Sequence, residues 1–251
     1  MGKERMDDKM MLFGTRAVIE AIKSDKEIDR LFVQTNLSNE LARELMGLLK
    51  EKNIAFQYVP VEKLNRLTGK NHQGVVGYVS EISYQKIEDV LPFLFEQGKL
   101  PLLLVLDRIT DVRNFGAICR SAECAGVDAV IIPSRGAAQV NADAIKTSAG
   151  ALHTIPVCRE DNLKNVLDFL QESGVRIVAC TEKADQFYFE AELSGPVALL
   201  MGSEEDGISP EYLKRAEQQV KIPMKGSISS LNVSVATGII LFEALRQRMQ
   251  I

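Results

Sequence analysis

The stretch from Leu102 to Ile132 reads LLLVLDRITDVRNFGAICRSAECAGVDAVII, and its pattern decides the fold. Residues 102–106 form a continuous apolar run, which is typical of a strand buried on both faces. Residues 114–125 show a helical pattern, and residues 128–132 form a second buried strand. A strand, a helix and a strand in this order predict a parallel sheet with helices packed on it.

The same alternation continues toward the end of the chain. Further strands are predicted at residues 154–157, 176–179, 197–201 and 220–223. Further helices are predicted at residues 140–148, 162–172, 210–216 and 233–249. Because strands and helices alternate throughout, residues 101–251 are expected to form an α/β domain with a mostly parallel sheet and helices on both faces.

A smaller α/β unit is expected at residues 1–80. Its predicted helices and strands alternate at residues 17–21, 30–33, 39–50, 54–59, 61–67 and 74–79. Residues 81–100 are acidic on balance and contain Pro92 and Gly98, so we expect a linker with at most one short helix there. The chain is therefore expected to contain two domains joined by this linker.

The composition excludes several classes of protein. Of the 251 residues, 46% are hydrophobic and 25% are charged, which is typical of a globular protein rather than a disordered one. No apolar run reaches the roughly 18–20 residues that span a bilayer, so no membrane segment is expected. The four cysteines show no CxxC spacing and only two histidines occur, so no metal site is expected. Without an export signal at the start, we expect reduced thiols and a cytoplasmic location.

Three unusual segments follow predicted strands, which is where open α/β sheets bind their ligands. The first, residues 107–121, opens the helix after the first apolar run and contains Asn114 and Arg120. Asn114 is a suitable helix cap, and Arg120 follows six residues later, near two helical turns away. The pattern alone leaves two interpretations open, a capped helix with an Arg–Asp pair and a functional site.

The second segment, residues 201–210, leaves another buried strand. Gly202 and Gly207 would let the backbone approach a ligand closely, but Glu204 and its acidic neighbours would repel a phosphate. The alternative interpretation is a solvated loop in which Ser209 caps the next helix.

The third segment, residues 222–234, mixes proline, glycine and small polar residues before a long predicted helix. It offers several hydrogen-bonding groups in little space. The alternative interpretation is a helix cap formed by Ser230 or Asn232. Taken alone, this segment is a weak indication of function.

Together, the three segments match a known set of motifs in order and spacing. The motifs are Asn114-x-Gly116-x-x-x-Arg120-Ser121-Ala122, Gly202-Ser203-Glu204 with Gly207, and Ile222-Pro223-Met224-x-Gly226 followed by Ser230-Leu231-Asn232-Val233-Ser234. In this combination the chain resembles the SpoU (TrmH-like) branch of the SPOUT RNA methyltransferases. Residues 11–80 resemble the ribosomal-protein-like substrate-binding domain of the members that act on large-subunit ribosomal RNA. One departure is Val112, where many members have proline.

The resemblance implies a specific reaction and architecture. The reaction is 2′-O-methylation of a guanosine ribose in 23S-type large-subunit ribosomal RNA, with S-adenosyl-L-methionine as the methyl donor. The implied fold is a trefoil-knotted methyltransferase domain at residues 101–251 after an RNA-binding domain at residues 1–80. The family also implies a homodimer through the C-terminal domain, whose active site takes residues from both chains, and no membrane or metal is implied.

The resemblance also assigns roles to individual residues. The residues that match the cofactor-binding positions are Gly202, Ile222, Met224 and Leu231. The residues that match the catalytic and substrate-positioning positions are Asn114, Arg120, Glu204, Ser230 and Asn232. A guanidinium stays protonated at neutral pH, so we expect Arg120 to stabilise the developing alkoxide and hold a phosphate rather than accept a proton. Glu204 is expected to orient Arg120 or Asn114.

Other functions remain alternatives. One is 2′-O-methylation of guanosine in transfer RNA, and another is a non-catalytic RNA-binding or ribosome-assembly factor on the same fold. A nicotinamide-dependent dehydrogenase is excluded because no G-x-G-x-x-G follows the first strand of either domain. The net charge of −4 means that RNA binding would depend on local clusters of basic residues.

Overall fold

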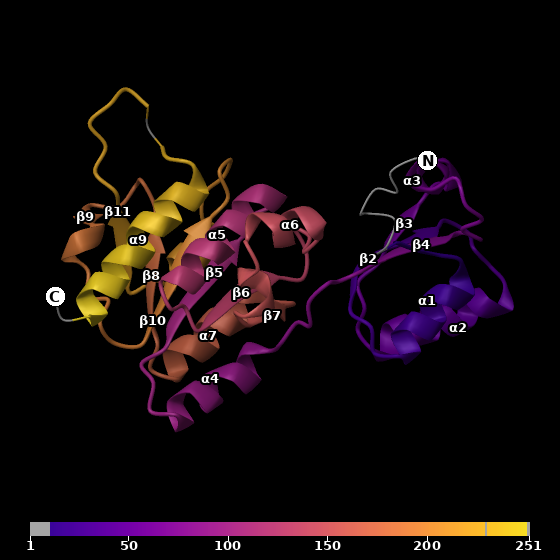
Figure 1. The fold of residues 1–251 in the computed structure, drawn as a ribbon, viewed down its shortest axis with the longest axis horizontal. Coiled ribbons are helices and arrows are strands. Elements are labelled where there is room, and N and C mark those ends of the chain that lie inside the picture. The colour runs from indigo at the N-terminus through magenta and orange to yellow at the C-terminus, as the bar shows by residue number, and fades with distance from the viewer. Residues whose placement is uncertain (1–10, 229, 250–251) are drawn as a thin grey trace. The chain divides into compact units, whose positions relative to one another are not determined.

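The computed structural model describes residues 11–228 and 230–249, which form two compact units (Figure 1). The first unit comprises residues 11–83 and the short stretch 140–142, and the second comprises residues 84–139 and 143–249. Each unit has its own sheet and its own buried apolar residues.

The first unit is built on a four-stranded sheet in the order β1-β4-β2-β3. Its strands are β1 Met11–Phe13, β2 Ile28–Gln34, β3 Gln57–Val59 and β4 Val75–Val79. Its helices are α1 Thr15–Lys23, α2 Glu40–Glu51 and α3 Val61–Leu67. β4 pairs antiparallel with β1 and β2, whereas β2 and β3 run parallel. The sequence pattern did not indicate β1, which is only three residues long.

Alternating side chains bury both faces of this sheet. Leu31 of β2 belongs to a buried cluster with Val18 of α1 and Leu45 of α2. The next residue, Phe32, points to the opposite face and packs with Leu64 of α3. The three helices therefore cover the sheet from two sides.

The second unit contains a seven-stranded, fully parallel sheet in the order β7-β6-β5-β10-β8-β11-β9. Its strands are β5 Leu102–Asp107, β6 Ala129–Pro133, β7 Val157–Glu160, β8 Arg176–Cys180, β9 Gln186–Phe187, β10 Val197–Gly202 and β11 Gln218–Lys221. The parallel sheet predicted from the sequence is confirmed. β7 begins later than predicted because the N–H groups of Thr154 and Ile155 close a turn onto the carbonyl of Ala151.

Helices cover both faces of the parallel sheet. The helices are α4 Ile87–Glu96, α5 Val112–Cys124, α6 Ala142–Thr147, α7 Leu163–Glu172, α8 Pro210–Leu213 and α9 Val233–Arg248, with 3-10 turns η2 Ala151–His153 and η3 Tyr188–Glu190. Leu103 and Val105 of β5 lie in a buried cluster with residues of α4 and α7. Leu104 and Leu106 alternate with them and point to the opposite face, where α5 and α9 pack against each other (Figure 1).

The segment 81–100, which the sequence indicated as a linker, contains α4. Ile87 and Leu91 of this helix are buried in the core of the second unit. The backbone N–H of Ile87 donates to Oε1 of Glu160 at 2.8 Å, which ties the start of α4 to β7. The boundary between the units falls within this segment, and α4 is a structural part of the second unit.

Candidate active site

A cavity of about 460 Å³ opens beyond the carboxyl ends of the neighbouring strands β10, β8 and β11. Its lining includes every residue that the sequence assigned to the cofactor, namely Gly202, Ile222, Met224 and Leu231. Glu204, Ser230 and Asn232 also line this cavity. The volume lies within the range of about 300–1,000 Å³ that small-molecule sites occupy in proteins.

Gly202 is required by a tight turn of the chain itself. A Cβ atom at this position would lie 2.2 Å from the carbonyl carbon of Gly207 and 2.3 Å from the nitrogen of Ile208. The N–H of Gly207 donates to the carbonyl of Ser203 at 3.0 Å, and Gly207 has a φ of 68°. The sequence indicated glycines that admit a ligand, and the structure shows that the closest approach at Gly202 is to its own backbone.

The three motifs meet in one cluster of hydrogen bonds. Nδ2 of Asn114 donates to Oε1 of Glu204 at 3.0 Å, and Nδ2 of Asn232 donates to the same oxygen at 2.9 Å. Nδ2 of Asn232 also donates to Oδ1 of Asn114 at 3.1 Å. The N–H of Val233 points at Oε1 of Glu204 from 3.4 Å. We call Asn114, Glu204 and Asn232 the amide–carboxylate cluster.

Two members of the cluster, Asn114 and Asn232, lie at the starts of helices, and only Asn232 is also a helix cap. Asp111, and not Asn114, caps α5, because its carboxylate accepts the N–H of Asn114 at 2.7 Å. The expectation that Asn114 is the cap is therefore wrong, and its side chain is left for Glu204. Asn232 does cap α9, because its Oδ1 accepts the N–H of Ser234 at 3.0 Å while its Nδ2 serves the cluster.

Arg120 forms no hydrogen bond with the amide–carboxylate cluster. It is exposed on α5 on the same face as Arg113, seven residues before it, and near Cys124, one turn later. Within residues 11–228 and 230–249, Arg120 makes no hydrogen bond or ion pair. The structure thus joins Glu204 to Asn114 and Asn232, and the alternative that Glu204 orients Arg120 is not what it shows.

Ser230 lines the cavity and is exposed. Among the described residues it makes no hydrogen bond, so its hydroxyl is not part of the amide–carboxylate cluster. Its neighbour, residue 229, lies outside the described residues.

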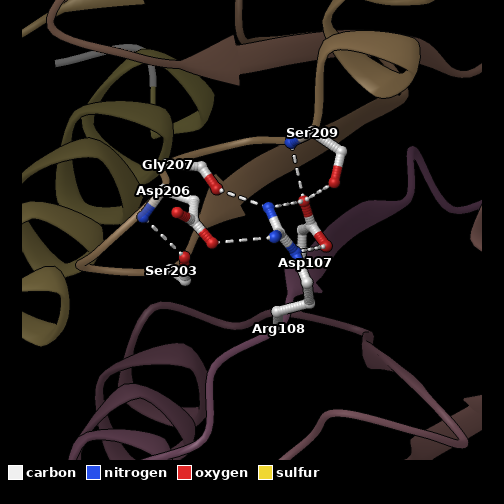
Figure 2. A network of polar contacts seen from close by, with 6 residues as sticks. All are labelled: Asp107, Arg108, Ser203, Asp206, Gly207 and Ser209. Atoms are coloured by element: carbon white, nitrogen blue, oxygen red, sulfur yellow. Dashed lines mark hydrogen bonds and ion pairs between the residues drawn. The ribbon is translucent and has the colours of Figure 1, made fainter.

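Asp107 is a residue of this region whose role the sequence did not reveal. It ends β5, its side chain is 2% exposed, and Oδ2 accepts both the N–H and the hydroxyl of Ser209 at 2.7 Å (Figure 2). Ser209 stands at the N-cap position of α8, but its hydroxyl serves Asp107, so the expected side-chain cap is wrong. A charged residue directly after an apolar strand is the signal that could have indicated this anchor.

The cavity wall also contains the thiol of Cys180. Burial raises the pKa of this thiol, so it stays protonated at neutral pH and is a poor nucleophile. Among the described residues, no cluster of histidine, cysteine and acidic side chains is placed to hold a metal ion. No helix formed by the same residues is long and apolar enough to cross a bilayer.

Both units of the chain match families of known proteins. Residues 101–242 match the model of the SpoU rRNA Methylase family, and residues 11–85 match the model described as RNA 2′-O ribose methyltransferase substrate binding. The 23S rRNA (guanosine-2′-O-)-methyltransferase RlmB of Photobacterium profundum is 39% identical, over 95% of this chain and 98% of its own length.

Two solved structures are also similar. The SpoU methyltransferase AviRb from Streptomyces viridochromogenes, in complex with the cofactor AdoMet, is 25% identical with a TM-score of 0.62, over 99% of this chain and 95% of that chain. The TrmH/SpoU tRNA modifying enzyme of A. aeolicus is 32% identical with a TM-score of 0.56, but over only 65% of this chain and 85% of its own. The family models, the full-length relative and the shared fold agree, and the chain belongs to the SpoU rRNA methylase family.

Proposed function

We propose that this protein transfers a methyl group from S-adenosyl-L-methionine to the ribose 2′-oxygen of a guanosine in 23S-type ribosomal RNA. The observation that carries the proposal is the amide–carboxylate cluster, which joins all three motifs at the edge of a cavity of ligand size. The match to RlmB over almost the whole chain supports ribosomal RNA as the substrate. The substrate-binding match at residues 11–85 supports the same choice, and the first unit would then bind the RNA.

The cavity fits the proposed cofactor in size and chemistry. Ile222, Leu231 and Ile240 provide apolar wall, and Gly202 contributes backbone at the end of β10. Carboxylates such as Glu204 on the same wall favour a cationic ligand. When bound, S-adenosyl-L-methionine supplies an electrophilic methyl group on its sulfonium.

The residues around the cavity would hold the ribose and stabilise the charge that develops on its 2′-oxygen. Glu204 fixes the two amides of Asn114 and Asn232, so that the remaining donor and acceptor sites of Asn114 hold the ribose. Arg120 provides a permanent positive charge that holds a phosphate of the RNA and stabilises the oxygen anion as the 2′-OH loses its proton. Arg120 does not take that proton, because a guanidinium remains protonated at neutral pH. The proton passes to water or to a phosphate of the RNA as the 2′-oxygen takes the methyl group, and the demethylated cofactor leaves as a neutral thioether.

The protein is also proposed to act as a homodimer through the second unit, in the cytoplasm. Val235 and Phe242 on α9 and Met249 at its C-cap are exposed and repeat every seven residues, so they form one apolar stripe along this helix. A second copy packed on this stripe would remove it from water. Light scattering should give the mass of two chains, and Phe242→Glu should convert the dimer to a monomer. We also propose that the second unit contains the trefoil knot that the family resemblance implies.

The test is methyl transfer from labelled S-adenosyl-L-methionine to RNA from a strain that lacks the gene. Ribosomal and transfer RNA are assayed separately, with Arg120→Ala as the control. We expect label in large-subunit RNA, recovered as 2′-O-methylguanosine and lost in the variant. Label only in transfer RNA would keep the chemistry and overturn the substrate. Cofactor binding without label in any RNA or pre-ribosomal particle would favour an assembly factor.

A further inference from the structure

Arg108 connects the end of β5 to the turn that follows β10 (Figure 2). Its Nε and Nη2 atoms donate to the two carboxylate oxygens of Asp107, at 3.0 and 3.3 Å. Its Nη1 donates to Oδ2 of Asp206 at 3.1 Å, and Nη2 also donates to the carbonyl of Gly207 at 3.2 Å. One guanidinium therefore binds two carboxylates and a backbone carbonyl.

The turn bound by Arg108 is the one that carries Glu204. Arg108 contacts its second half at Asp206 and Gly207, and Asp107 holds Ser209 just beyond it. Within the turn, the N–H of Asp206 donates to the hydroxyl of Ser203 at 3.2 Å. The hydrogen bonds that Arg108 donates and those that Asp107 accepts thus hold in place the stretch of backbone from which Glu204 reaches the amide–carboxylate cluster.

The acidic residues of the turn explain why a positively charged side chain is bound to it. Glu204, Glu205 and Asp206 are consecutive acidic residues, and they repel one another in a tight turn. In the described part of the chain, Arg108 is the basic side chain that forms an ion pair with this acidic run. The hydrogen bond with Asp107 raises the pKa of Arg108, so its charge is constant over the working pH range.

The backbone of Arg108 is also unusual. Its φ of 57° is a left-handed conformation that residues other than glycine rarely adopt. This conformation occurs at the junction where β5 ends and the contacts of the guanidinium begin. The side-chain contacts offset the cost of this backbone conformation.

We propose that Arg108 is a positioning residue for methyl transfer, which acts by fixing the turn Ser203–Gly207 and thereby the carboxylate of Glu204. The inference rests on the proposed function of the amide–carboxylate cluster. Arg108 and Glu204 both line a second cavity of about 260 Å³, which also contains Asn114. The effect on Glu204 is indirect, since the guanidinium contacts Asp206 and Gly207 and does not touch Glu204.

The test compares Arg108→Ala and Arg108→Lys with a matched control, Arg215→Ala. Arg215 forms the same kind of paired contact with Asp168 at 2.6 and 3.3 Å, in the same unit but between the turn after α8 and helix α7. The readouts are kcat and KM for RNA, and the hydrogen exchange of the backbone amides of residues 203–207 in the full chain.

We expect Arg108→Ala to lower kcat about tenfold while the KM for RNA stays within about twofold, because a displaced carboxylate affects the reacting geometry more than RNA binding. Exchange in the turn should accelerate about tenfold. Arg108→Lys should restore part of kcat, since an ammonium keeps the charge but cannot form the same fork. Arg215→Ala should leave kcat and the exchange of the turn unchanged.

Two outcomes would overturn the inference. One is an Arg108→Ala protein with the kcat and turn exchange of the wild type, and the other is an equal loss of kcat in Arg215→Ala. If Arg108→Ala fails to fold, Asp206→Asn weakens the same contact and must show the same accelerated exchange and lowered kcat. If the wild-type protein transfers no methyl group, the proposed function is refuted. The hydrogen exchange of residues 203–207 still tests the inference in that case, because unchanged exchange in the Arg108 variants would show that Arg108 does not anchor the turn.

Discussion

Helix α5 presents two motif residues in opposite situations. Asn114 lies in its first turn and is held by Glu204 and Asn232, whereas Arg120 lies further along and makes no hydrogen bond or ion pair with any described residue. A side chain whose partners are inside the chain is fixed before any ligand arrives. A cation without such a partner is available to an anion from outside. In the proposed function, the comparison therefore separates residues that build the site from a residue that would receive the substrate.

The largest expected effect concerns Arg120. Arg120→Ala should lower kcat by about 10²–10³-fold, because it removes a charge that stabilises the transition state. Arg120→Lys should keep part of the activity, since a point charge still neutralises a phosphate and an oxygen anion. Steady-state methyl transfer to the RNA substrate measures both variants.

The thermal midpoint should not change in either Arg120 variant, because no hydrogen bond or ion pair within the described chain is lost. Equal loss of activity in the alanine and lysine variants would contradict a role that depends on charge. A lowered midpoint in Arg120→Ala would show that Arg120 has a structural partner and would remove the contrast with Asn114.

The next largest effect concerns Glu204, which holds the side chain of Asn114 in place. Glu204→Ala removes the acceptor shared by Asn114 and Asn232, and hydrogen bonds to charged groups contribute about 1.5–3 kcal/mol each. We expect a loss of kcat of about ten- to a hundredfold. Glu204→Gln keeps one side-chain oxygen as acceptor and should lose at most about tenfold. Kinetics of the two variants side by side would show whether geometry or charge matters, and equal losses would favour charge.

The sequence predicted the sheet better than the cluster. The apolar runs that became β5, β6 and β10 are local patterns, and local patterns are visible in one chain. The position of β10 between β5 and β8 is not local, because the pairing of Val197 with Leu102 joins residues about a hundred positions apart. The two-residue strand β9 is too short to show any period.

The contacts of individual site residues were also hard to predict, because they join residues that are distant in the sequence. Asp111 and Asn114 are both good helix caps, and the residue types alone do not show that α5 begins at Val112 with Asp111 as its cap, while the side chain of Asn114 bonds to the distant Glu204. Motif spacing brought Arg120 into the candidate site, but spacing contains no information about which face of α5 a residue occupies relative to α9. The anchors Asp107 and Arg108 were missed because their partners lie about a hundred residues later in the chain.

A smaller effect concerns the buried side of α5. A Cβ on Gly116 would lie 2.8 Å from the carbonyl oxygen of Ala144 and from the Cβ of Thr147, so Gly116→Ala should destabilise the protein by about 1–3 kcal/mol. The matched control is Gly238→Ala on α9, where the nearest atom is 3.9 Å away and alanine should be neutral or stabilising by up to about 1 kcal/mol. Chemical denaturation measures both. Equal stability of the two variants would mean that α5 can move away from α6, and its positioning of Asn114 would then be weaker than the structure indicates.

The smallest effect uses thiols to test the two faces of α5 directly. Cys124 is exposed one turn beyond Arg120, whereas Cys119 is buried and its burial raises the pKa of the thiol. Burial likewise raises the pKa of Cys158, to about 12, and that of Cys180. An alkylating reagent at pH 8 should therefore modify Cys124 and spare the other three thiols, because the thiolate is the reactive form.

If Arg120 receives the RNA backbone, bound RNA should slow the labelling of Cys124 by about twofold or more, whereas RNA bound elsewhere would leave the rate unchanged. Mass spectrometry of the labelled peptides distinguishes the two cases, and rapid labelling of Cys119 would refute the assignment of the buried face.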